Sequence, residues 1–107
     1  MQTNNFDHVW DLLQHKLRPQ TVIRNWTALK GYLGDTMTIV AVNADSIEVN
    51  APKAKNILVV PKTDFETIWE VWPQYKNHRV QRQEIRDMTF YSKYIISIFR
   101  WLETENG

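Results

Sequence analysis

Six basic or hydroxyl-bearing side chains in the last third of the chain are spaced as on the faces of two helices. They are Arg79, Arg82, Arg86, Lys93, Ser97 and Arg100. Positively charged groups neutralise phosphates, and a hydroxyl group can hydrogen-bond to a base or to the sugar-phosphate backbone. This set therefore favours nucleic-acid binding, and we expect DNA rather than RNA as the partner.

Charge is distributed unevenly along the chain, although the net charge of the whole is only +1. Residues 76–100 carry six Lys and Arg against two Asp and Glu, which gives +4, whereas the remaining seven basic and ten acidic residues give −3. A local basic segment in a nearly neutral protein indicates an anionic partner. The alternative is a surface that faces water or another protein, since many helix pairs with basic faces bind no nucleic acid.

The sequence gives little support for catalysis or metal binding. The chain has no cysteine, which excludes disulfides, thiolate metal sites and thiol nucleophiles. His8, His15 and His78 are not spaced as metal ligands, and no Gly-rich phosphate loop or serine elbow is present. Asp64 and Glu66 are better explained by helix capping than as an acid and a base. We therefore expect no enzyme activity, no cofactor and no metal.

An antiparallel sheet is predicted in the middle of the chain. Three β-rich runs indicate strands at 36–43, 46–51 and 57–60. We expect a hairpin turn near residues 43–45, where Asn and Asp occur. Residues 21–27 would suit a fourth strand, but their apolar residues would also suit a helix. Gly31 and Gly34 should break whatever element precedes them.

Helices are predicted before and after the strands in the sequence, because apolar residues repeat there at helical spacing. They are expected at about 5–17, 65–72, 80–88 and 92–103. Thr63 and Glu66 form a capping-box pattern, and Pro73 should end or kink the helix that follows them. The last two helices would form a pair like a helix-turn-helix, in which the second helix lies in the major groove.

These elements predict one α+β domain spanning residues 1–107. It has an N-terminal helix, a three- to four-stranded antiparallel sheet and three C-terminal helices with a helix-turn-helix-like last pair. The N-terminus lacks the basic start and apolar core of a signal peptide, and no apolar run is long enough to span a bilayer. We therefore expect a cytoplasmic protein without a membrane partner.

Five tryptophans are unusual for a chain of 107 residues, and we expect most of them in the core. A pocket lined by Trp69, Trp72 and Tyr75 could stack a base or another ligand. Exposed tryptophans or an exposed strand edge could instead form a dimer interface. Homo-oligomerisation is therefore a second expectation beside nucleic-acid binding.

The segment "FETIWEVWPQYKNHRVQRQEIRDMTFYSKYIISIF" resembles a known α+β module. Relatives of that module are attached to restriction-type endonucleases, and others are free-standing in mobile-element genes such as integron cassettes. The similar features, within residues 33–102, are a strand pair, a helix like Phe65–Trp72, an arginine like Arg82 or Arg86, and a final helix beginning like Ser92–Ile95. The resemblance implies DNA association without catalytic residues.

Two functional hypotheses follow from these observations. The first is a non-enzymatic, nucleic-acid-binding accessory protein, DNA-associated, with a basic face on its C-terminal helices. The alternative is a protein-interaction or homo-oligomerising module of a mobile genetic element that does not contact nucleic acid.

Overall fold

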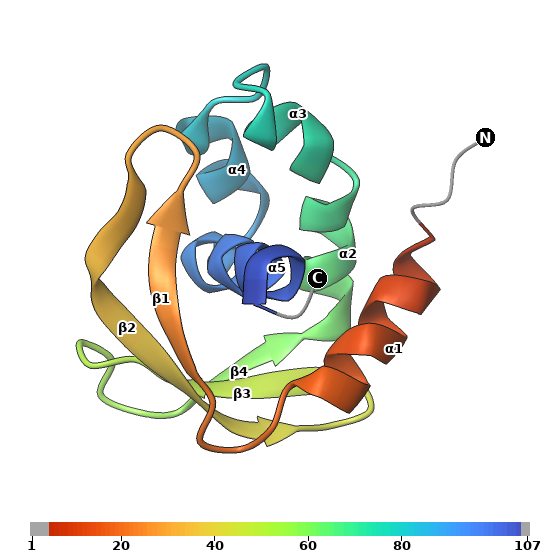
Figure 1. Cartoon of the computed structure of the whole chain (residues 1–107), viewed down its shortest axis with the longest axis vertical. Coiled ribbons are helices and arrows are strands. Elements are labelled where there is room, and N and C mark those ends of the chain that lie inside the picture. The colour runs from red at the N-terminus through yellow and green to blue at the C-terminus, as the bar shows by residue number, and fades with distance from the viewer. Residues whose placement is uncertain (1–4, 106–107) are drawn as a thin grey trace.

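The computed structural model describes residues 5–105, and its last helix, α5 (Ser92–Glu105), lies at the centre of the fold. Figure 1 looks almost down the axis of α5 and shows the strands and the other helices arranged around it. Residues 95–99, which make more than one helical turn, are each at most 1 % exposed. The rest of the chain therefore covers α5 on all sides at this level.

The sheet is a four-stranded antiparallel meander, as predicted, and residues 21–27 contribute a strand rather than a helix. The strands are β1 (Val22–Thr27), β2 (Gly31–Val42), β3 (Ser46–Asn50) and β4 (Leu58–Pro61). The register shifts between Arg24 and Trp26 on β1 and between Ile39 and Ala41 on β2. Such bulges bend a strand and increase its twist. They help the sheet to curve around α5.

The prediction that both glycines after β1 break the chain is wrong for Gly34. Gly31 has φ +74 and closes the β1–β2 hairpin, a backbone conformation that glycine adopts without steric cost. Gly34 lies inside β2, because the ladder to β1 forms on either side of it, at Tyr32 and Thr36. The result is a strand of 12 residues that is long enough to pair with β1 at one end and β3 at the other.

In the described part of the chain, four helices follow the sheet where three were predicted. The remaining helices are α1 (Phe6–Lys16), α2 (Lys62–Trp69), α3 (Trp72–Lys76) and α4 (Arg82–Met88). The predicted helix 65–72 ends early, and Pro73 begins a new helix instead of ending one. Proline is tolerated in the first turn, where its missing N–H would have no partner. Within residues 5–105, no helix is long and apolar enough to cross a membrane.

The capping box predicted at Thr63 and Glu66 does not form. Helix α2 starts directly after β4 at Lys62, and no side chain caps it. The Lys62 amide instead donates to the carbonyl of Asp45 at 2.8 Å, so the β2–β3 turn holds the start of the helix. A capping box is present on α4, where Gln81 and Glu84 bond reciprocally.

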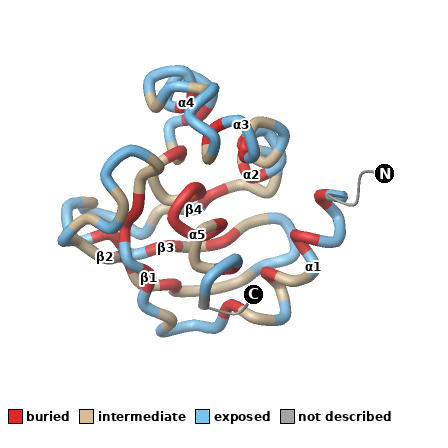
Figure 2. Tube along the Cα trace, turned by 45° about the horizontal axis from the view of Figure 1, so that its top comes forward, coloured by how far each residue is buried: buried red, intermediate tan, exposed pale blue. Residues whose placement is uncertain are grey.

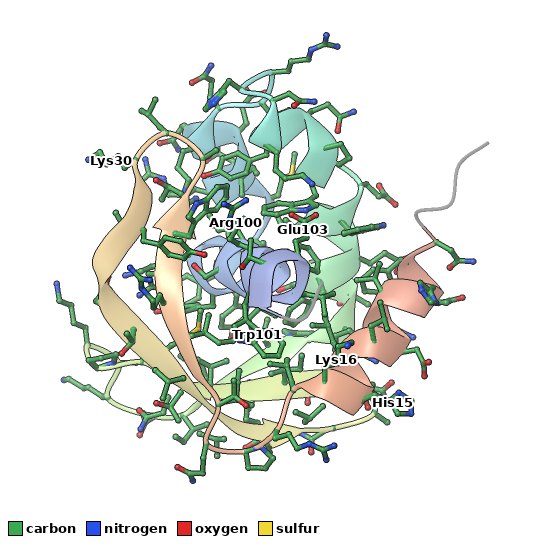
Figure 3. The ribbon with its side chains drawn as sticks, viewed as in Figure 1. His15, Lys16, Lys30, Arg100, Trp101 and Glu103 are labelled. Atoms are coloured by element: carbon green, nitrogen blue, oxygen red, sulfur yellow. The ribbon has the colours of Figure 1, made fainter. Side chains whose placement is uncertain are left out.

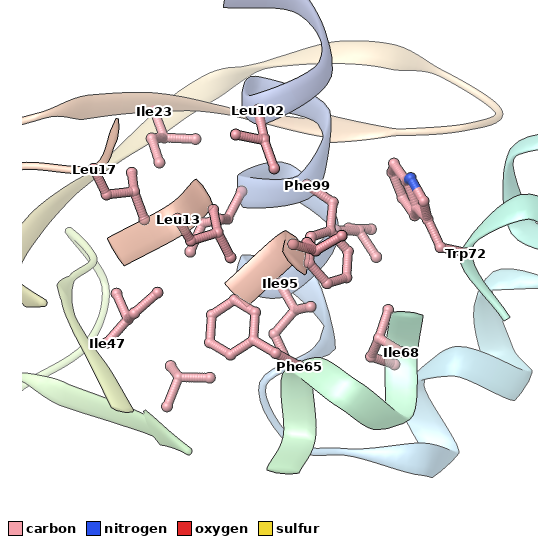
Figure 4. Close-up of a cluster of buried hydrophobic side chains, with 14 of the residues drawn as sticks. Leu13, Leu17, Ile23, Ile47, Phe65, Ile68, Trp72, Ile95, Phe99 and Leu102 are labelled. Carbon is pink, nitrogen blue, oxygen red and sulfur yellow. The ribbon is translucent and has the colours of Figure 1, made fainter. Parts of the chain in front are cut away.

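The core is one cluster in which α5 contacts residues from every layer, as the buried segments in Figure 2 and the close-up in Figure 4 show. The predicted stripe of α1 is buried as expected, and Leu13 is fully enclosed. Phe65 on α2 packs edge-on against Phe99 of α5 at 5.9 Å between ring centroids. Aromatic rings supply large apolar area per residue, which suits a domain of this size.

The tryptophans are mostly core residues, and they leave no stacking pocket among Trp69, Trp72 and Tyr75. Trp72 is 1 % exposed and Tyr75 is 3 % exposed. Trp26 meets Trp72 at 5.9 Å and Tyr75 at 6.3 Å, each edge-on. These rings fill the space that a stacked base would need, so the predicted ligand pocket between them is not present.

Candidate functional site at the hairpin tip and helix α4

The three predicted contact residues of α5 are bound into the fold. Lys93 forms an ion pair with Asp35 of β2, with 3.2 Å between Nζ and Oδ2. Ser97 is fully buried, and its Oγ accepts a hydrogen bond from the Trp26 amide at 3.0 Å. The Arg100 guanidinium lies over the Trp26 ring, 4.8 Å from its centroid, and Figure 3 labels this residue. The expected exposed polar face of α5 therefore packs against β1 and β2.

This arrangement changes the interpretation of the last two helices. Helices α4 and α5 do follow one another through a short turn at residues 89–91, as a helix-turn-helix would. However, a recognition helix must present one face to the major groove, and the middle of α5 is enclosed. The polar side chains of α5 instead bond to groups of the strands that face the helix.

The remaining predicted residues, Arg79, Arg82 and Arg86, lie on α4 and the segment before it. Arg79 and Arg86 are exposed, and Arg86 Nη2 donates to Gln83 Oε1 at 2.7 Å. Arg82 is partly buried, and its Nη1 donates to Ser92 Oγ at 3.0 Å. None of the three arginines forms an ion pair with a carboxylate of residues 5–105. These cations remain available to an external anion.

Burial lowers the pKa of the Arg82 guanidinium, while Tyr75 raises it and Arg86 lowers it further. Arginine stays protonated at any physiological pH, so the group remains a cation in a partly desolvated position. Both acids of α4 are already engaged. Glu84 accepts from the Gln81 amide at 2.8 Å, and Asp87 accepts from Gln83 at 2.9 Å.

Lys76, the other basic residue near α4, has a partner. Its Nζ lies 2.7 Å from Glu103 Oε2, and the same oxygen accepts from Trp72 Nε1 at 2.9 Å. Of the six basic residues between 76 and 100, Lys76, Lys93 and Arg100 are thus engaged by acids or by a ring. Within this segment, the charge without a partner therefore lies around α4.

A pocket at this end was not predicted from the sequence. It has a volume of about 290 Å³ and lies between the tip of the β1–β2 hairpin and the segment that joins α3 to α4. Leu29 and Lys30 line it from the hairpin, and Val80 and Arg82 line it from the other side. Figure 3 shows Lys30 at the hairpin tip. The hairpin residues are some 50 positions from Arg79 in sequence, and no local pattern links them.

Two features hold the walls of this pocket in place. The Tyr75 hydroxyl accepts a hydrogen bond from the Ala28 amide at 3.1 Å and so fixes the hairpin to α3. His78 adopts a left-handed backbone with φ 64, and the Arg79 amide then donates to Gln74 O at 2.8 Å. Asn77, a residue type that tolerates the left-handed conformation, instead has φ −90.

The histidines and acids that were considered for other chemistry lie apart. His15 faces Asp11 one turn away, with 3.5 Å between Nδ1 and Oδ1. Asp64 accepts from Thr89 Oγ1 at 2.9 Å and so attaches the α4–α5 turn to α2. Among residues 5–105, no three His, Cys, Asp or Glu side chains come together in a way that could hold a metal ion.

A scan against protein-family models, a search of curated proteins and a search of solved structures each found no match for this chain. The resemblance to restriction-linked and integron-cassette modules therefore stays a prediction, and the function must be argued from the site.

Proposed function

We propose that the protein is a non-enzymatic, DNA-associated accessory protein that contacts phosphates through Arg79, Arg82 and Arg86. The observation that carries this proposal is that all three guanidinium groups lack a carboxylate partner in the described structure, whereas Lys76 and Lys93 have one. Lys30 adds a fourth cation, because it lines the same pocket as Arg82. Unpaired cations gathered at one end favour a polyanion.

The enclosed position of α5 limits how DNA could be bound. Ser97 cannot reach a base, and Lys93 and Arg100 already have partners within the fold. We therefore propose contacts to the sugar-phosphate backbone rather than to base edges. Such contacts carry little sequence information, and their affinity falls steeply with salt.

Fluorescence anisotropy with labelled duplex and single-stranded oligonucleotides tests the proposal. Arg79→Gln and Arg86→Gln should each weaken binding and reduce the slope of log affinity against log salt by about 1. Lys55→Gln is the matched control, because it removes one charge from an exposed residue of the β3–β4 loop. Absence of binding to both oligonucleotides at low salt would refute the proposal.

A second candidate function is self-association through β4, the alternative in which no nucleic acid is bound. β4 is an edge strand of the sheet, Val59 on it is 50 % exposed, and Ile57 just before it is 42 % exposed. Exposed apolar edge strands can pair with another chain. Analytical ultracentrifugation should then show a dimer that Val59→Lys converts to a monomer, and a wild-type monomer at micromolar concentration would count against it.

The absence of cysteine fits a reducing compartment, and we propose the cytoplasm as the site of action. An origin in a mobile element or restriction-linked gene is likewise a proposal, which rests on the sequence resemblance alone.

A further inference from the structure

The pocket between the hairpin and α3–α4 combines apolar walls with cations and has no acid in its lining. Ala28, Leu29 and Leu33 form one wall, and Val80 stands in the segment opposite. Leu29 is 83 % exposed, so its side chain offers apolar surface at the mouth of the pocket. A ligand that entered the pocket would bury this surface.

Arg82 supplies a charge that the protein itself does not neutralise. Its Nη1 donates to Ser92 Oγ, whereas Nε and Nη2 have no hydrogen-bond partner among residues 5–105. Partly buried charges in proteins are normally paired, because an unpaired charge loses hydration without compensation. A carboxylate suits this group, since its two oxygens match the planar guanidinium donors.

We infer that this pocket binds a small aliphatic acid, with the carboxylate on Arg82 and Lys30 and the hydrocarbon body against Leu29, Leu33 and Val80. The volume of about 290 Å³ is close to the lower limit of small-molecule sites. A space of this size suits a short-chain carboxylic acid, of which octanoate is an example.

Aliphatic walls also argue against a stacked base as the occupant. Bases stack on aromatic faces; besides the imidazole of His78, the aromatic ring in the lining is that of Tyr75, which is 3 % exposed and whose hydroxyl accepts from the Ala28 amide of the hairpin. A short hydrocarbon chain fills an aliphatic pocket without needing a flat surface. The proposed ligand shares Arg82 with the proposed DNA contacts, but its apolar contacts to Leu29, Leu33 and Val80 are separate from them.

Methyl NMR on protein labelled at Ala, Leu and Val tests the inference with octanoate as the probe. Octanoate should shift the methyl signals of Ala28, Leu29, Leu33 and Val80 in a saturable way. The Val59 methyls provide the control for non-specific adsorption, because Val59 is half exposed on β4 and does not line the pocket. Octylamine, which has the same chain and the opposite charge, should bind at least tenfold more weakly.

Variants separate the head-group contact from the apolar contact. Arg82→Gln should weaken octanoate binding at least tenfold, in line with the strength of charge-assisted hydrogen bonds. Lys30→Gln should weaken it less, and this residue is exposed on the hairpin, so the variant will fold even if Arg82→Gln does not. Val80→Phe should block the pocket, and Lys55→Gln should change nothing.

Three results would overturn the inference: octylamine binding as tightly as octanoate, Val59 shifting as much as the pocket methyls, or unchanged affinity in Val80→Phe. The proposed DNA contacts are tested separately, with different variants. Arg79→Gln and Arg86→Gln alter residues outside the pocket lining, so they should weaken DNA binding without affecting octanoate.

Discussion

Replacing Ser97 by alanine distinguishes a structural role of this residue from a role in binding. The side chain is fully buried between α5 and β1, where its Oγ accepts from the Trp26 amide at 3.0 Å and donates to the Lys93 carbonyl at 3.1 Å. Trp26 follows the β1 bulge, and Ser97 is the partner of its amide. Without the hydroxyl, that buried N–H has no acceptor.

The loss of stability comes from leaving one buried hydrogen-bond donor, the Trp26 amide, without an acceptor. A cavity contributes little, since serine and alanine differ little in volume. A buried polar group without a partner costs about 1–3 kcal/mol, so Ser97→Ala should lower the free energy of unfolding by that amount. For a domain near 100 residues, each kcal/mol corresponds to a fall in Tm of about 4–8 °C. DNA affinity, measured where both proteins are folded, should not change.

Thr104→Ala is the matched control. Thr104 lies on the same helix and its Oγ1 donates to the carbonyl four residues earlier, at Arg100, with a distance of 2.9 Å. Ser97 makes the same kind of bond to Lys93, but Thr104 is exposed. Exposed substitutions usually change stability by less than about 0.5 kcal/mol. Urea denaturation of both variants gives the comparison, and equal stability of Ser97→Ala and Thr104→Ala would refute the reasoning.

Two further predictions concern the other polar residues of α5. The hydrogen bond from Lys93 holds the pKa of the Asp35 carboxyl below its usual range. The pair therefore stabilises the protein fully above the unfolded pKa of about 3.9. This contribution is lost as the pH falls through the lower pKa of the folded state. Because both side chains are about 40 % exposed, Asp35→Asn should cost only about 0.2–1 kcal/mol at pH 7 in urea denaturation. The difference from wild type should shrink below about pH 3.9 and vanish once the pH is below the lowered folded pKa. Arg100→Ala should lose about 0.5–2 kcal/mol by removing the guanidinium from the Trp26 ring, whereas Arg86→Ala, at an exposed position, should stay within about 0.5 kcal/mol in the same assay.

The elements that were predicted correctly are those whose apolar period decides which face is buried. Helix α1 buries the residues that the spacing selected, from Phe6 to Leu17, because one stripe faces the core and the other faces water. On β3, Ile47 and Val49 are fully buried and alternate with more exposed residues, as the sequence indicated. In such segments the local pattern and the tertiary environment agree.

The last helix shows where this reasoning fails. Polar residues at helical spacing indicate that one side of a helix is not filled by aliphatic groups, but they do not identify what faces it. On α5 that side faces β1, whose bulge presents the Trp26 amide to Ser97, and Asp35 on β2 lies opposite Lys93. The spacing is equally compatible with a helix face that is exposed to water and with one that packs against a polar strand surface. Only the arrangement of the sheet around the helix decides between them.

The arginines of the candidate site keep their charge because the neighbouring carboxylates of α4 bond elsewhere. In sequence, Glu84 and Asp87 stand one, two or five residues from Arg82 and Arg86, and side chains at those spacings on a helix do not face each other. In the fold, Glu84 instead caps α4 through the Gln81 amide, and Asp87 accepts from the side chain of Gln83. The guanidinium of Arg82 donates to Ser92 Oγ and lines the pocket beneath the hairpin. The charge available to a ligand at this end therefore depends on where the acids of α4 stand and bond, as well as on the number of basic residues in the segment.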